Sequence, residues 1–139
     1  MSLPTVWDAK LIEIPTFEAE SGGKLIAIED TEFPIKRSFF VRDIPVSNSF
    51  RGNHAHKNTI QILVCTRGII HVELKDGVNS TTIGLSEYDN KGLLVPAGLW
   101  DSQQYLVEHS ELLVYSSSLY NDREDYIDDY QEFLKYRKL

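Results

Sequence analysis

The stretch RGNHAHKNTIQ, residues 51–61, contains two histidines that are separated by a single residue, His54 and His56. On an extended strand, residues i and i+2 point to the same face, so both imidazoles would enter one space. Histidine changes its protonation state near neutral pH and is also the commonest metal ligand. The pair therefore indicates a proton-transfer site or half of a metal site, with two surface histidines in a loop as the alternative.

Two short patterns in the chain resemble the two motifs of the cupin family. A glycine followed by His-x-His is the first motif, and Pro96 to Asp101 resembles the second, P-x-G-x-x-H. The chain departs from metal-binding cupins twice, because Gln61 stands where they have a glutamate and Asp101 where they have a histidine. Two imidazoles and a neutral amide make a poor metal site, but His54, His56 and Asp101 would form a 2-His-1-carboxylate set.

Short apolar or alternating runs, separated by turn signals, recur along the chain. They cover residues 24–30, 35–41, 59–74, 81–88, 92–98 and 111–118. Strands at this spacing, with no helical runs between them, are typical of an antiparallel sandwich or barrel. The run 59–74 predicts a hairpin whose arms are joined through Thr66, Arg67 and Gly68.

The C-terminal segment has a different periodicity. Apolar residues from Tyr126 to Leu134 recur every three or four positions, carboxylates crowd the start, and Lys135 and Arg137 lie near the end. This polarity suits the helix macrodipole. We predict an amphipathic helix over about residues 122–138, packed outside a β core with its acidic residues in solvent. The whole chain, residues 1–139, is predicted to be one domain.

The composition argues against several classes of protein. The 139 residues carry a formal net charge of −7, whereas non-specific nucleic-acid binding needs a basic surface. No apolar stretch approaches the ~20 residues of a membrane-spanning helix, and no signal peptide is visible. The single Cys65 lies in the apolar run ILVC, which predicts a buried thiol and rules out an intramolecular disulfide. We expect a cytoplasmic protein that binds neither nucleic acid nor membrane.

Nearly the whole chain, from about Gly23 to Phe133, resembles the small cupin-type nucleotide-sugar 3,4-ketoisomerases, which act on dTDP-4-keto-6-deoxyglucose in deoxysugar biosynthesis. The segments that carry the resemblance are FPIKR (33–37), RGNHAHK (51–57), QILVC with Gly68 (61–68), VPAGLW (95–100) and SLYNDREDYIDDY (118–130). The resemblance implies an all-β cupin, a small jelly-roll barrel with a C-terminal helix. It also implies a homodimer in which N-terminal strands pair across the interface.

The resemblance further implies a reaction that needs no metal and no other cofactor. Moving a ketone from C4 to C3 requires removal of the C3 proton, an enediol, and return of a proton to C4. His54 matches the family's base by position and is expected to take the C3 proton. His56 is expected to orient His54, to donate to a sugar oxygen, or to relay the proton.

Substrate-binding residues are expected around this pair. The ligand's phosphates require cations in an acidic protein, and Arg51 is the first candidate, because a guanidinium offers a planar fork. Arg37 and Lys57 are further candidates. Gln61 either hydrogen-bonds a sugar hydroxyl or is an inward-facing strand amide.

Four positions leave the mechanism open. Trp100 either forms a slot for the thymine base or belongs to the core, and Asp101 either points into the barrel to meet substrate or is a turn residue. Where these isomerases have two tyrosines, the chain has Phe39 and Phe40, which cannot transfer a proton. Three explanations stay open: another group such as Asp101 or a water replaces the tyrosine, the product differs in configuration at C4, or the chain is a binder. The second proton could be returned by His56, Asp101 or Tyr105. The sequence predicts a nucleotide-sugar 3,4-ketoisomerase, with a metal-dependent cupin enzyme and a non-catalytic nucleotide-sugar-binding cupin as alternatives.

Overall fold

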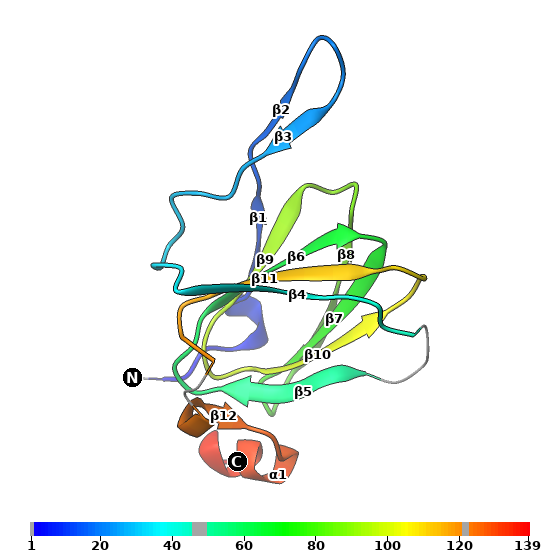
Figure 1. The fold of residues 1–139 in the computed structure, drawn as a ribbon. Helices are drawn as coiled ribbons and strands as arrows, with labels where there is room; N and C mark the ends of the chain where they lie inside the picture. The colour runs from blue at the N-terminus through cyan, green and yellow to red at the C-terminus, as the bar shows by residue number, and fades with distance from the viewer. Residues whose placement is uncertain (1, 46–49, 121–122) are drawn as a thin grey trace.

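Two five-stranded sheets form most of the structure (Figure 1). The computed structural model describes residues 2–45, 50–120 and 123–139. One sheet has the strand order β1-β9-β6-β11-β4 and the other has the order β12-β5-β10-β7-β8. All the described strand pairs are antiparallel. The prediction of an antiparallel sandwich or barrel is therefore confirmed.

The bounds of the elements are as follows. The first sheet contains β1 (Lys10–Glu13), β9 (Lys91–Val95), β6 (Gln61–Arg67), β11 (Glu111–Ser116) and β4 (Arg37–Val41). The second contains β12 (Tyr126–Ile127), β5 (Arg51–His56), β10 (Trp100–Tyr105), β7 (Ile69–Lys75) and β8 (Ser80–Ser86). Outside the sheets lie the 3₁₀ helices η1 (Val6–Asp8) and η2 (Arg123–Asp125), the helix α1 (Tyr130–Tyr136), and the hairpin of β2 (Thr16–Glu18) and β3 (Lys24–Ile26).

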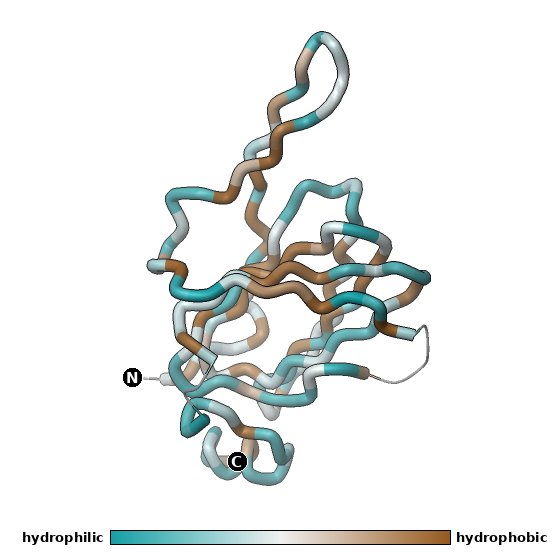
Figure 2. The backbone as a smooth tube through the Cα atoms, viewed as in Figure 1, coloured by the Kyte–Doolittle hydropathy of each residue, from teal (hydrophilic) through white to brown (hydrophobic). Residues whose placement is uncertain are grey.

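The main hydrophobic core lies between the two sheets. β7 alternates buried and less buried residues, as expected of a strand with one face on a core. β6 is buried at five consecutive positions because a second apolar cluster, with Ile14 and Phe33, covers its other face. Figure 2 shows apolar residues along the strands that cross the middle of the molecule and hydrophilic residues in many of the loops. Cys65 is buried in the core, as predicted, and burial raises the pKa of its thiol to about 11.

The predicted hairpin over residues 59–74 is wrong. β6 pairs with β9 and β11, whereas β7 pairs with β8 and β10, so the two runs lie in different sheets. Only Gly68 separates them, and its positive φ of 80° turns the chain from one sheet into the other. The hairpin in this region is β7–β8. The Asp76 side chain closes its turn by accepting hydrogen bonds from the backbone N–H groups of Val78 and Asn79.

The C-terminal helix is shorter than the predicted span of about 122–138. α1 begins at Tyr130, after Asp129, whose carboxylate accepts hydrogen bonds from two backbone N–H groups of the first turn. Residues 126–127 instead pair with β5 as β12, and η2 precedes them; residue 122 lies outside the described residues. Not every acidic residue of this segment faces solvent, because Asp125 is only 1% exposed. None of the helices in the described ranges is long and apolar enough to span a membrane.

Candidate active site

The histidine pair lies on β5 and faces the interior of the barrel. His54 and His56 both line one pocket, whereas Ala55 between them packs on the opposite side, against Ile127 and Phe133. The two imidazole rings meet edge to face, with centroids 4.9 Å apart. Tyr126 of β12 lies against both rings, with centroid distances of 5.4 Å to His54 and 4.5 Å to His56. The expected sharing of one space by the two imidazoles is therefore present.

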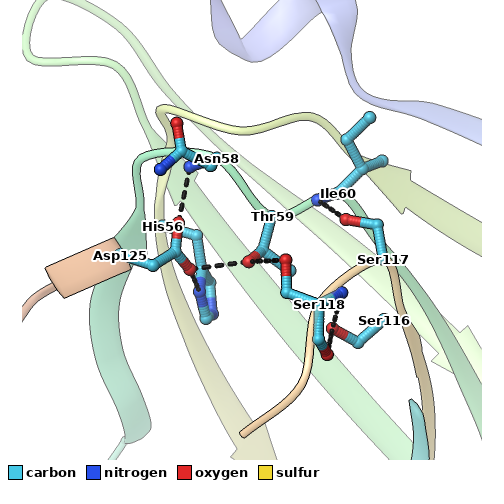
Figure 3. A network of polar contacts seen from close by, with 8 residues as sticks. All are labelled: His56, Asn58, Thr59, Ile60, Ser116, Ser117, Ser118 and Asp125. Atoms are coloured by element: carbon cyan, nitrogen blue, oxygen red, sulfur yellow. Dashed lines mark hydrogen bonds and ion pairs between the residues drawn. The ribbon is translucent and has the colours of Figure 1, made fainter. Parts of the chain in front are cut away.

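A buried carboxylate holds His56 from outside the histidine motif. Asp125 Oδ2 lies 2.7 Å from His56 Nδ1 and accepts a hydrogen bond from Thr59 Oγ1 at 2.6 Å. Asp125 Oδ1 accepts from the backbone N–H of Asn58 at 2.5 Å. Figure 3 shows Asp125 placed between these three groups, with the Thr59 hydroxyl also bonded to Ser118. The turn after β5 and the segment before α1 are thereby tied together at the histidine.

The pocket beside the histidines has a volume of about 590 Å³, within the range of small-molecule sites. Five of the residues predicted from the sequence line it: Arg37, Arg51, His54, His56 and Gln61. The sequence did not indicate five further polar or aromatic residues of its lining as site residues: Gln103, Tyr120, Arg123, Tyr126 and Asp128. Apolar residues complete the wall: Phe39, Val41, Leu63, Leu112 and Val114.

Two predicted binding residues lie elsewhere. Trp100 is 7% exposed and packs against Tyr130 and Phe133, because it lies opposite Ala55 on the side of the sheet that α1 covers. It belongs to the core and does not line the pocket. Lys57 follows β5 and lines a separate surface groove beside α1. The structure therefore supports the core interpretation of Trp100 and gives Lys57 no place in the histidine pocket.

The protein lowers the pKa of both histidines from their ordinary value. For His54 the main cause is burial, followed by the neighbouring His56. For His56 burial is again the largest cause, and the hydrogen bond and charge of Asp125 work against it. Both rings are therefore mainly neutral at neutral pH, which leaves each with one nitrogen lone pair to accept a proton.

Two arginines of the pocket lie over aromatic rings. The Arg37 guanidinium lies 4.4 Å from the centroid of Phe39 and 5.2 Å from that of Tyr120. Arg123 lies 4.8 Å from the centroid of Tyr126. Such stacking keeps a guanidinium extended while its edge remains available for an anion. Arg37 Nε is buried and has no hydrogen-bond partner among the described residues.

Asp101 is buried in the barrel and does not line the pocket. It lies opposite His54 in the β5–β10 ladder, and its Oδ1 accepts a hydrogen bond from Gln103 Nε2 at 2.6 Å. Gln103 reaches the pocket because Gly52, at φ 91°, leaves room: a Cβ there would lie 3.0 Å from Gln103 Nε2. Burial raises the pKa of Asp101 to about 7, against the smaller effect of the Gln103 hydrogen bond. Asp101 is a strand residue, so the turn interpretation is wrong.

The polar groups give little support to a metal site. Among the described residues, no three His, Cys, Asp or Glu side chains are arranged to hold a metal ion, and His54, His56 and Asp101 are not such a group. Asp101 Oδ1 accepts a hydrogen bond from Gln103, and Asp101 does not line the pocket with the two histidines.

The missed residues had one signal in the sequence. Asp125, Tyr126 and Asp128 lie in the segment SLYNDREDYIDDY, which carried the family resemblance but was assigned to the helix by its periodicity. Gln103 follows Asp101 by two positions and would share its face on a strand. Tyr120 and Arg123 lie in the same segment, residues 118–130.

The fold and the pocket are those of a small cupin in which paired histidines face the cavity, and comparisons with known proteins agree. A family model described as "FdtA: WxcM-like, C-terminal" matches residues 7–138. The TDP-4-oxo-6-deoxy-alpha-D-glucose-3,4-oxoisomerase of Aneurinibacillus thermoaerophilus is 36% identical over 120 residues, which is 84% of each chain. The chain therefore belongs to the FdtA, WxcM-like C-terminal family, and the predicted family and cupin fold are confirmed.

Solved structures agree with this assignment. A 3,4-ketoisomerase from Helicobacter canadensis has a TM-score of 0.86 at 32% identity, covering 95% of this chain and 98% of that one. The sugar 3,4-ketoisomerase QdtA from Thermoanaerobacterium thermosaccharolyticum, solved with TDP, has a TM-score of 0.87 at 29% identity and 96% coverage of both chains. A mutant of QdtA has been solved with TDP-4-keto-6-deoxyglucose. The protein is an isomerase of this family.

Proposed function

We propose that the protein converts dTDP-4-keto-6-deoxyglucose to its 3-keto isomer by proton transfer through an enediol. The observation that carries this proposal is the edge-to-face pair of His54 and His56, 4.9 Å apart, in a pocket of about 590 Å³. The substrates named for the oxoisomerase of A. thermoaerophilus and for QdtA support the choice of sugar and nucleotide.

His54 is the base that removes the C3 proton. It lines the pocket, and burial lowers its pKa, so the ring is neutral at working pH and holds a lone pair. The electron pair of the C3–H bond enters the enediolate, O4 gains a proton while the O3 hydroxyl loses one, and a proton added at C4 completes the isomerisation. No external oxidant or reductant is consumed. Positioned acid–base groups of this kind contribute ~10²–10⁴-fold to rate.

The arginines of the pocket bind the charged part of the substrate. Arg37 and Arg51 line the pocket, and their planar forks suit phosphate oxygens. Gln61 and Gln103 offer neutral amides to the sugar hydroxyls from the first and second sheets. A neutral amide orients a hydroxyl without changing the charge that the histidines experience.

The test is incubation with dTDP-4-keto-6-deoxyglucose in D₂O. Deuterium should enter the sugar at C3 or C4, and the 3-keto product should form. His54→Asn should abolish both while it retains dTDP binding, because an amide cannot accept the proton. A protein that binds the nucleotide sugar and yet neither exchanges hydrogen at these carbons nor forms the 3-keto product would refute the activity. Full turnover by His54→Asn would place the base elsewhere.

We also propose a homodimer in which the β2–β3 hairpin packs on a second copy. The hairpin projects from the two sheets (Figure 1), and its apolar residues are exposed, Phe17 by 59%, Leu25 by 65% and Ile26 by 48%. An isolated two-stranded hairpin is marginal in water without a surface to pack on. Sedimentation should give a dimer, and the variant Phe17→Asp with Leu25→Asp should give a folded monomer. Tyr88→Asp, at a residue 83% exposed, should remain dimeric.

A further inference from the structure

The buried pair of Asp125 and His56 defines the tautomer of the second histidine. Asp125 is 1% exposed, yet hydrogen bonds from Thr59, His56 and the backbone of Asn58 outweigh the effect of burial and hold its pKa below the usual value. An ionised carboxylate only accepts hydrogen bonds. The His56 nitrogen that faces it, Nδ1, must therefore carry a proton.

The other ring nitrogen of His56 is then the chemically available one. Nε2 is buried and has no hydrogen-bond partner among the described residues, and the ring lines the pocket beside His54. In a neutral imidazole with a proton on Nδ1, Nε2 holds the lone pair. The site thus holds an unpaired proton acceptor in a ring that lines the pocket, next to the proposed base.

We propose that Asp125 is a positioning residue that fixes His56 as the Nδ1–H tautomer, so that Nε2 serves as a second proton acceptor and donor in the pocket. This role rests on the proposed isomerisation. Nε2 takes a proton from the sugar or from His54 and becomes an N–H. The imidazolium is stabilised by the Asp125 carboxylate 2.7 Å from Nδ1, and Nε2 then gives a proton back to the sugar. Protons and electrons balance over the cycle.

Asp125 is suited to this role because its own position is fixed. Oδ2 is shared between His56 and Thr59, and Oδ1 is held by the Asn58 backbone. The backbone carbonyl of Asp125 also accepts from the N–H of Lys57 at 2.8 Å. These contacts fix the carboxylate relative to the end of β5, so the imidazole cannot rotate without breaking a charged hydrogen bond.

The decisive variant is Asp125→Asn. An asparagine has the same shape, but it can offer an N–H to His56 Nδ1 and so favours a proton on Nε2. We expect kcat to fall by about 10²-fold or more with KM little changed, because the binding residues are untouched. The matched control is Asp129→Asn, in the same segment, where asparagine caps α1 as well as aspartate does. The control should retain the kcat of the parent protein.

¹⁵N NMR of histidine-labelled protein without substrate gives a readout that a merely structural role would not move. The parent protein should show His56 protonated at Nδ1 and unprotonated at Nε2, and Asp125→Asn should shift the proton toward Nε2. A parent spectrum with the proton on Nε2 overturns the proposal, even if the variant does not fold. An unchanged kcat in folded Asp125→Asn also overturns it. If the parent protein isomerises no nucleotide sugar, the proposed function fails, whereas the spectrum still tests the tautomer.

Discussion

The carboxyl group of Asp101 accepts a hydrogen bond from Gln103 Nε2 at 2.6 Å, and Gln103 itself lines the pocket. Burial raises the pKa of Asp101 from 3.8 to about 7. Between pH 3.8 and about pH 7, the Asp101 carboxyl keeps its proton in the folded protein, whereas in the unfolded chain it has lost that proton. The stability that this proton provides is complete below about pH 4 and is lost as the pH rises through 7.

The first prediction concerns Asp101→Asn. Because an amide does not ionise, the variant should lose less stability than the parent protein between pH 5 and pH 8, with a difference of about 2–4 kcal/mol for a shift of this size. Urea denaturation at several pH values measures it. The nearby Ser102→Ala serves as a control that retains the carboxyl. Parallel stability curves for parent and Asp101→Asn would show that Asp101 ionises normally.

The second prediction separates the two phenylalanines of β4, Phe39 and Phe40. Phe39 lines the pocket under Arg37, whereas Phe40 is 51% exposed and lies beside Arg42 on the other face of β4. Phe39→Tyr should therefore change kcat or the stereochemistry of the product at C4, because it adds a hydroxyl beside the substrate. Phe40→Tyr should change neither. NMR analysis of the product sugar checks both, and equal effects of the two substitutions would contradict the assignment.

The strand content was predictable from the sequence, but the pairing of strands was not. The apolar pattern locates the β-rich runs, yet for residues 59–74 it predicts a single hairpin. β6 is buried at five consecutive positions, so its apolar and polar residues do not alternate, and the pattern does not indicate which sheet the strand joins. The chain changes sheets at a single residue, Gly68. A short glycine-containing turn occurs both in a hairpin and in a connection between two sheets, so the sequence does not distinguish them.

The site was predictable where it lies in one motif and unpredictable where distant segments meet. The spacing of His54 and His56 placed both imidazoles on one face, because that is a property of a strand. Asp125 reaches His56 only because residues 126–127 join β5 as a two-residue strand. Its sequence neighbourhood has helical periodicity, and tertiary pairing overrides that preference.

The third prediction tests Arg37 as an anion-binding residue. Arg37→Lys keeps the charge but loses the planar stack between Phe39 and Tyr120. We expect dTDP to bind about 10-fold more weakly, the equivalent of 1–2 kcal/mol. The matched control is Arg42→Lys, since Arg42 also lies over a phenylalanine, at 5.2 Å, but outside the pocket. Isothermal titration with dTDP compares them, and an unaffected Kd for Arg37→Lys would remove Arg37 from the binding site.

The last prediction concerns the packing that holds the C-terminal segment against the site. Phe133 of α1 is fully buried against Trp100 and Tyr130, on the side of β5 opposite the histidines. Phe133→Ala should cost about 3–5 kcal/mol of stability, because it leaves a cavity between helix and sheet. Tyr88→Ala, at a residue 83% exposed, should cost little. Denaturant titrations measure both free energies of unfolding.

Since α1 follows β12 and η2 in the chain, loosening the helix in Phe133→Ala should also weaken the hydrogen bond of Asp125 to His56. The ¹⁵N spectrum of His56 in Phe133→Ala should then show a mixture of tautomers under conditions in which the protein remains folded. A single parent-like tautomer would mean that β12 and η2 hold Asp125 without the helix.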